Sequence, residues 1–155
     1  MKLSTRGRYA LRLMLHVARH DRDAPVSLND AARATDISRR YLEQLATTLK
    51  GAGLLTAVSG RSGGYRLARP ARSMRLDQIV QAAIGPINIV DCVLEPETCL
   101  KSTYCECRDV YTQINSRIVG AFHGLSLAEL VHNGATKKGK ALAVARRNGR
   151  GKQRA

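Results

Sequence analysis

Residues 27–68 decide the fold, and they read SLNDAARATDISRRYLEQLATTLKGAGLLTAVSGRSGGYRLA. Ser27 precedes a short Ala-rich run and can cap it as a helix, and Asp30 stands at the third position of a capping box. A turn follows, and Ser38 can cap a second helix. The apolar residues of this second helix share one face: Tyr41, Leu42, Leu45 and Leu49. The pattern predicts a short helix to about residue 34 and a longer helix to about residue 52.

A glycine-rich turn joins two short strand-like runs after the second helix. The runs are Leu54–Ser59 and Tyr65–Ala68, with Gly60-Arg-Ser-Gly-Gly64 between them. Gly53 stands where the C-terminal end of a helix favours glycine. Short helix, turn, longer helix and hairpin follow one another in the order of a winged helix-turn-helix. The predicted fold class is therefore mainly α with a small β-hairpin wing.

Amphipathic helices flank this core on both sides. Residues 5–20 carry apolar side chains on one face, and residues 76–83 repeat that pattern. From Arg108 an apolar stripe runs to Phe122, which is long for a helix that follows a finished domain. Such a stripe usually pairs with a copy of itself, so we expect a long C-terminal dimerisation helix and a homodimer.

The charge divides the chain into three parts. Residues 1–75 carry 15 Lys and Arg against 5 Asp and Glu, residues 76–133 carry 3 against 7, and residues 134–155 carry 8 against none. We interpret 1–75 as a winged helix-turn-helix DNA-binding domain, because a basic face usually binds nucleic acid. Residues 76–133 then hold the cysteine loop and dimerisation helices, including a capping box that opens at Ser126. Residues 134–155 are predicted to be a disordered basic tail.

Nothing in the chain predicts a membrane segment or a signal peptide. Charged side chains interrupt every apolar run near the N-terminus. The longest uncharged stretch, Gln78–Val90, has 13 residues and is too short to cross a bilayer. We expect a cytoplasmic protein, in which cysteines are more often ligands or redox groups than structural disulfides.

The exposed side chains of the second helix suit the reading of double-stranded DNA. Arginine can pair with guanine, glutamine with adenine, and glutamate can accept from cytosine. Arg61 at the wing tip suits the minor groove or its phosphates, and Ser4, Thr5, Arg6 and Arg8 could contact phosphates at the start of the first helix. In the second helix the candidate residues are Ser38, Arg39, Arg40, Tyr41, Glu43 and Gln44.

All four cysteines lie within one polar segment, residues 92–107. They are Cys92, Cys99, Cys105 and Cys107, spaced C-x6-C-x5-C-x-C. This spacing differs from that of zinc fingers, whose cysteine pairs are separated by two to four residues. A loop with three or four thiolates suits an iron–sulphur cluster, while zinc or a thiol redox switch are the alternatives from spacing alone.

Several motifs together resemble the Rrf-type (IscR/NsrR/RirA-like) family of winged-helix iron–sulphur transcriptional regulators, from Met1 to about Asn133. The motifs are Lys2-Leu-Ser-Thr-Arg-Gly-Arg-Tyr9, Ile37-Ser38 with Tyr41-Leu-Glu-Gln-Leu45, Gly63-Gly-Tyr-Arg-Leu-Ala-Arg-Pro70, Cys92 with Cys99 and Cys105, Arg108-Asp109, and Leu127-x-Glu-Leu130. The resemblance implies a homodimer held by the long helix and a two-fold operator read by paired recognition helices. It also implies a [2Fe-2S] or [4Fe-4S] cluster on the three cysteines.

Two features depart from the family pattern. Relatives take a fourth ligand from a histidine three places after the third cysteine, or from an acidic residue near position 8 of the partner chain. Here those positions hold Arg108 and Arg8, neither of which can ligate iron. Cys107 is the obvious substitute, with Glu106 beside it, unless an exogenous ligand fills the fourth site. The first gap between cysteines also has six residues where several relatives have five, so the cluster type stays open.

Three functions compete for this sequence. The first is a repressor or activator whose DNA binding depends on a cluster that senses iron, redox state or nitric oxide. The second is a cluster-free regulator of cysteine or sulphur metabolism, with its thiols as a redox switch or incidental. The third, a thiol oxidoreductase using Cys105-x-Cys107, is disfavoured because the chain has no C-x-x-C beside a βαβ pattern and no paired carboxylate cleft. We expect no enzymatic activity.

Overall fold

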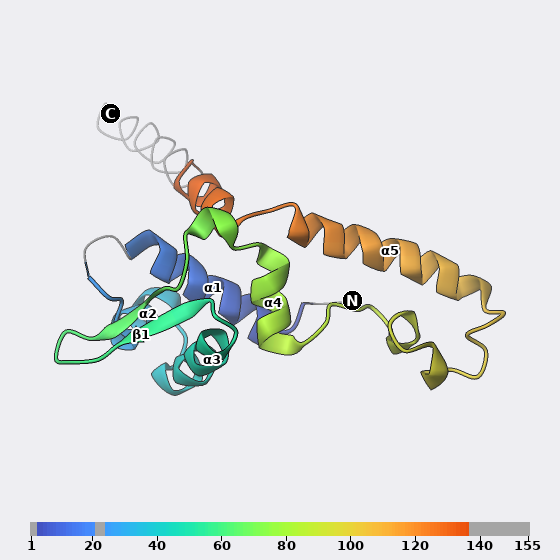
Figure 1. The fold of residues 1–155 in the computed structure, drawn as a ribbon, viewed down its shortest axis with the longest axis horizontal. Helices are drawn as coiled ribbons and strands as arrows, with labels where there is room; N and C mark the ends of the chain where they lie inside the picture. Colours follow the sequence, from blue (N-terminus) through green and yellow to red (C-terminus); the bar gives the residue numbers. More distant parts are fainter. Residues whose placement is uncertain (1–2, 21–23, 137–155) are drawn as a thin grey trace, which may run out of the picture.

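The computed structural model describes residues 3–20 and 24–136 and is mainly helical (Figure 1). Its longer elements are α1 (Thr5–His20), α2 (Leu28–Thr35), α3 (Arg39–Gly51), β1 (Leu55–Val58), β2 (Gly64–Leu67), α4 (Leu76–Ile84) and α5 (Glu106–His123). Short 3-10 turns lie between them: η1 (Ala71–Ser73), η2 (Asp91–Val93) and η3 (Pro96–Thr98). A last helix occupies residues 127–136. No helix in the described part of the chain is long and apolar enough to span a membrane.

The first four helices share one apolar core, which confirms the predicted winged helix-turn-helix. Each helix turns one apolar stripe inward, and the stripe of α3 is Leu42, Leu45, Ala46 and Leu49. Leu13 and Met14 of α1, Leu45 of α3 and Ile79 of α4 are all fully buried. Helix α4 packs chiefly against α1, so α4 is part of this module as well as the exit from it.

The predicted caps set the helix boundaries. The Ser27 hydroxyl accepts a hydrogen bond from the backbone N–H of Asp30 at 3.1 Å, and the Ser38 hydroxyl accepts one from the N–H of Tyr41 at 3.3 Å. Asp36 adopts a left-handed conformation (φ 55°) between the two helices. Gly53 follows the end of α3 and has a φ of 68°, a backbone conformation that glycine adopts without strain.

The wing is an antiparallel hairpin that is anchored at its base. Leu55 pairs with Leu67 and Val58 with Gly64. The backbone of Tyr65 also exchanges two 2.9 Å hydrogen bonds with Val26, in the segment that leads into α2. A side chain on Gly64 would collide with the carbonyl of Val26, so the close approach requires glycine at this position.

Helix α5 extends away from the winged module and carries the cysteine segment at its far end (Figure 1). Asn115 is the only buried residue of this helix. Val110, Tyr111 and Ile114 are 54%, 37% and 41% exposed. The first half of the predicted stripe is therefore uncovered in the single chain, whereas Ile118 and Phe122 are half-buried and Phe122 packs against the core.

Three details differ from the predictions. The cysteine segment, expected to be a loop, contains the short turns η2 and η3, and α5 begins at Glu106 rather than Arg108. The last helix is opened by the predicted capping box and continues to residue 136, into the segment from residue 134 that we expected to be a disordered tail. Most of the predicted basic tail, residues 137–155, lies outside the described residues, so its disorder stays a prediction.

Candidate nucleic-acid interface and cysteine segment

The first two turns of α3 present a polar surface opposite the core. Arg39, Arg40, Glu43 and Gln44 are exposed, while Leu42 between them is fully buried. The burial of one face fixes the rotation of the helix, so the polar side chains point outward together. This is the arrangement that the sequence predicts for a helix that reads base edges.

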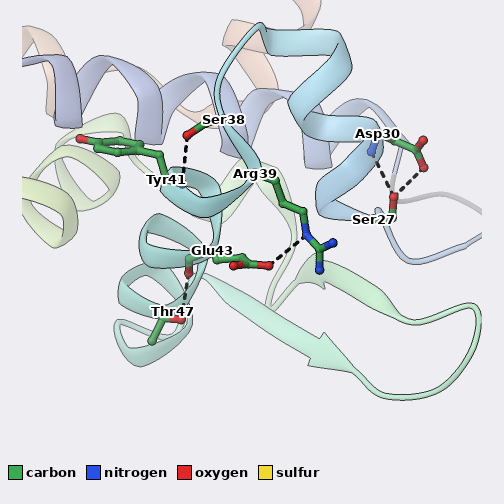
Figure 2. A network of polar contacts seen from close by, with 7 residues as sticks. All are labelled: Ser27, Asp30, Ser38, Arg39, Tyr41, Glu43 and Thr47. Carbon is green, nitrogen blue, oxygen red and sulfur yellow. Dashed lines mark hydrogen bonds and ion pairs between the residues drawn. The ribbon is translucent and has the colours of Figure 1, made fainter.

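Two of these side chains form an ion pair (Figure 2). The Nε of Arg39 donates to Oε1 of Glu43 at 3.0 Å, and the two side chains are 61% and 49% exposed. An exposed pair of this kind contributes at most about 1 kcal/mol. The pair can therefore open at little cost when either group meets a base or a phosphate.

Two hollows flank the outer face of α3. The first, of about 550 Å³, lies between α3 and the wing and includes Arg39, Arg61 and Tyr65 in its lining. The second, of about 510 Å³, includes Arg6, Arg40 and Gln44. Both are shallow and open, and both touch the same face of α3. The structure thus brings the predicted wing arginine and the predicted recognition helix to one surface.

The remaining candidates have local partners. The Ser38 hydroxyl caps α3, and the ring of Tyr41 packs edge-on against Tyr9 with centroids 5.7 Å apart. At the start of α1, the Ser4 hydroxyl accepts from the N–H of Gly7 at 3.2 Å, and Arg8 donates to the Thr5 hydroxyl at 3.1 Å. These contacts orient the side chains, and Ser4, Thr5 and Arg8 stay exposed.

Arg6 differs from the expectation that it contacts phosphate. Its Nε donates to the carbonyl of Ala83 at 2.6 Å, and its Nη2 donates to the Thr48 hydroxyl at 3.0 Å. The side chain is half-buried between three helices. Two nitrogens of its guanidinium are therefore engaged by protein groups, while the side chain still lines the second hollow.

Two residues of this surface were not among those predicted from the sequence. Thr47 is exposed and lines both hollows, and Asn29 lines the first from the start of α2. Thr47 lies four residues after Glu43, and its hydroxyl donates to the carbonyl of Glu43 at 2.9 Å. Helical spacing alone could have placed it on the same face.

Asp30, in the first turn of α2, is held by its neighbours along the chain. Asp30 accepts from the Ser27 hydroxyl at 2.7 Å and is paired with Arg33. The Ser27 hydroxyl, followed by Arg33, lowers the pKa of the Asp30 carboxyl below its ordinary value. The charge therefore stays ionised at the positive N-terminal end of α2, where it stabilises the helix.

The four cysteines occupy distinct places in the arm, which comprises the cysteine segment and α5. Cys92 lies in η2, Cys99 follows η3, Cys105 is the N-cap residue of α5 and Cys107 lies in its first turn. All four are free thiols, and Cys107 is the exposed one among them. The guanidinium Nε of Arg108 donates to the carbonyl of Cys92 at 2.8 Å, which ties η2 to the start of α5.

The chemistry of the donors fits a sulphur-ligated centre, although the thiols do not converge here. Across residues 3–20 and 24–136, no three His, Cys, Asp or Glu side chains are close enough to hold a metal ion. The segment does offer three half-buried thiols with no disulfide among them, which is the donor set that iron–sulphur clusters use. Arg108 is a cation engaged with the backbone and offers no ligand.

Comparisons with known proteins identify the family. Residues 3–133 match the model of the Rrf2 family, described as iron-dependent transcriptional regulators. The chain is 35% identical over 133 residues to the HTH-type transcriptional regulator IscR of Photobacterium profundum, covering 86% of this chain and 77% of that one. It is 37% identical over 131 residues to IscR of Aliivibrio salmonicida, covering 84% and 77%.

Solved structures agree with the sequences. CymR, the global cysteine regulator of B. subtilis, superimposes with a TM-score of 0.73 at 28% identity, over 86% of this chain and 98% of that chain. IscR of T. potens gives a TM-score of 0.72 at 28% identity, over 86% and 88%. With the family model matching most of its length and IscR proteins above 30% identity, the chain belongs to the Rrf2 family of transcriptional regulators.

Proposed function

We propose that this protein is a sequence-specific DNA-binding regulator whose affinity for its operator is modulated by an iron–sulphur cluster. The observation that carries the DNA half is the single surface formed by the outer face of α3 and the wing tip. A polar helix of this kind fits the major groove, while an arginine on a glycine-rich wing fits the neighbouring minor groove.

The side chains of α3 divide between reading and positioning. Arg40, Glu43 and Gln44 have the groups that distinguish base pairs and are exposed. Arg8 and Arg61 contribute phosphate contacts, which raise affinity for every sequence alike. Ser4, Thr5, Ser38, Arg39 and Tyr41 complete the proposed interface.

Cys92, Cys99 and Cys105 would hold the cluster, with Cys107 as the proposed fourth ligand. A [2Fe-2S] cluster is the favoured form and [4Fe-4S] the alternative. When bound, the cluster supplies a centre that responds to iron supply, oxidants or nitric oxide. The backbone tie from Arg108 to Cys92 supports this arrangement, because it already holds the first cysteine beside the helix that carries the last two. The names of the IscR relatives and the family description support it further.

The uncovered face of α5 supports a homodimer. Val110, Tyr111 and Ile114 form an apolar stripe that the single chain leaves in water. A second copy of the same helix would cover it and place two recognition helices on one face of a duplex. Two-fold DNA sites would then match the symmetry of the protein.

The structural likeness to CymR favours a second candidate function. In that alternative the chain binds no cluster, and its thiols act as a redox switch or are incidental in a regulator of cysteine or sulphur metabolism. The cysteine segment is compatible with it, since the four thiols are free.

The two candidates are separated by anaerobic purification followed by a visible spectrum and iron and sulphide analysis. We expect a coloured protein with stoichiometric iron and sulphide. The triple substitution of Cys92, Cys99 and Cys105 by Ala should remove both, whereas Cys107→Ser should change the spectrum and keep the iron. A colourless, iron-free protein, fresh from anaerobic cells and after reconstitution, would exclude the cluster and favour the alternative.

A further inference from the structure

The Arg6 guanidinium joins the recognition helix to the end of α4. One arm of its planar fork donates to the Thr48 hydroxyl in α3, and the Nε donates to the Ala83 carbonyl in the last turn of α4. These partners are 42 and 77 residues away in sequence. A cation is also favoured at that position, because the last carbonyls of a helix carry its negative end.

On the α3 side, the hydrogen bond from Arg6 to Thr48 is connected to the backbone of Gln44, a proposed base-reading residue. The Thr48 hydroxyl accepts from Arg6 and donates to the carbonyl of Gln44 at 3.0 Å. The hydroxyl is thereby fixed as both donor and acceptor, so it has one orientation. Arg6 also lines the hollow that contains Arg40 and Gln44. A displacement of Arg6 would therefore shift α3 at the surface that we propose contacts DNA.

On the α4 side, further hydrogen bonds from side chains to backbone carbonyls follow between Ala83 and the first cysteine, Cys92. Asn115 of α5 donates to the carbonyl of Ile87 at 3.2 Å, and Arg108 donates to the carbonyl of Cys92 at 2.8 Å. Side chains from α1 and α5 thus hold three carbonyls between residues 83 and 92. Gly85, at φ 86°, is the one residue of this stretch with a positive φ, and it lies directly between the first two anchors.

We propose that Arg6 is the positioning residue that couples the cysteine segment to the recognition helix. That this connection regulates DNA binding rests on the proposed function. The hydrogen-bonded connection itself does not require a cluster. A shift of Cys92 moves the segment 83–92, which α5 holds at the carbonyls of Ile87 and Cys92. The other end of this segment is the Ala83 carbonyl, to which Arg6 donates. The rigid fork passes the displacement to Thr48 and hence to α3.

The first test measures coupling with DNA. A duplex selected from random sequences by the unchanged protein serves as the probe, and affinity is measured for anaerobically reconstituted and cluster-free protein. We expect Arg6→Gln and Thr48→Val to bring the ratio of the two affinities to within about twofold of one. Arg6→Lys should fail to restore it, because an ammonium keeps the charge but lacks the fork. Arg8→Gln is the matched control: it removes the same charge from the same turn of α1, and should weaken both forms equally with the ratio unchanged.

The second test needs no cluster. In cluster-free protein, hydrogen exchange of the amides in 83–93 is followed with and without the duplex. Binding at α3 should slow this exchange in the parent and in Arg8→Gln, and the effect should vanish in Arg6→Gln and Thr48→Val. The Thr48 variant is close in shape to the parent and loses only the hydroxyl, so it tests the link even if Arg6→Gln fails to fold.

The outcomes separate the two proposals. If the parent shows no difference between loaded and free protein but keeps the DNA-dependent exchange, cluster control fails while the link through Arg6 stands. If the affinity ratio and the exchange response survive in both Arg6→Gln and Thr48→Val, Arg6 is only a structural brace and the inference is overturned. The same conclusion follows if DNA leaves exchange in 83–93 unchanged in the parent.

Discussion

The winged module and the cysteine-bearing arm are built on opposite principles. In the module, α1, α3 and α4 each bury an apolar stripe, and Leu13, Leu45 and Ile79 have no contact with solvent. In the arm, Asn115 is the only buried residue of α5, and Leu100 in the cysteine segment is 98% exposed. The module has the contacts that hold it together, whereas the arm presents surfaces that need something further to cover them. The difference is between a module whose apolar core is closed and an arm whose apolar side chains stay open to solvent.

The largest expected effect is on stability, and it separates the two regions directly. Leu45→Ala in the module should lower the free energy of unfolding by about 2–5 kcal/mol, because it leaves a cavity in a closed core. Val110→Ala on the arm should change the unfolding of the single chain by less than about 0.5 kcal/mol, because that side chain is already half in water. Chemical denaturation of both variants at low protein concentration checks the contrast.

Protein concentration then sharpens the comparison. If a second copy covers α5, the Val110→Ala deficit should grow as concentration rises, while the Leu45→Ala deficit should stay constant. A sedimentation profile that stays monomeric at every concentration, with no growth of the Val110 effect, would argue against dimerisation through this face.

The second prediction concerns DNA and falls within the module. Arg40→Ala and Glu43→Ala should each change operator preference by about 1–3 kcal/mol for each base that the variant no longer recognises, measured as the affinity ratio between selected and scrambled duplexes. Lys50→Ala, at the opposite end of the same helix, removes a charge without altering that ratio. If both variants discriminated as the parent does, the outer face of α3 would not be the surface that reads the bases.

The Arg39–Glu43 pair complicates that measurement in a testable way. Removing Glu43 also frees Arg39, so part of the change would come from the released guanidinium. A double-mutant cycle with Arg39→Ala separates the pair from the direct contact.

The smallest effect is a pH dependence at two carboxyls near helix N-termini, Glu129 and Asp30. Glu129 accepts from the backbone N–H and the hydroxyl of Ser126, and these bonds hold the pKa of its carboxyl below its ordinary value. A carboxyl with a lowered pKa in the folded state stabilises the protein above its unfolded pKa, about 4.3, and this stabilisation is lost as the pH falls through the lower folded value. Glu129→Gln keeps an acceptor but cannot titrate, so acid unfolding below about pH 4.3 should become slightly less steep.

Asp30→Asn is the matched change in the winged module. Its carboxyl also has a lowered pKa, with the Ser27 hydroxyl as the main cause. Equal slopes of acid unfolding in the parent and in both variants would show that neither carboxyl contributes.

How far the sequence predicts this molecule depends on the range of the contacts. The caps at Ser27 and Ser38 and the helical spacing of leucines are local signals, and the observed bounds of α1, α2 and α3 lie within a residue or so of the predicted ones. The turns η2 and η3 carry no periodic pattern, because short polar turns bury no stripe of their own. They could not be predicted in that way.

The site follows the same division. The exposed row on α3 was predictable because amphipathic spacing places it, and Thr47 belongs to the same row by its spacing. The inward turn of Arg6 was not, since it depends on Ala83 and Thr48, which only the folded chain brings near. The positions of Cys105 and Cys107 at the start of α5 were also unpredictable, because they depend on where that helix begins.

The two hydrogen bonds between Val26 and Tyr65 join the base of the hairpin to the segment that leads into α2, so the two segments must fit each other. Grafting a wing from a relative would therefore require positions 26, 64 and 65 to travel together. Any side chain at position 64 would collide with the Val26 carbonyl and force the two segments apart, and one at position 63 would collide with the Val58 carbonyl inside the hairpin.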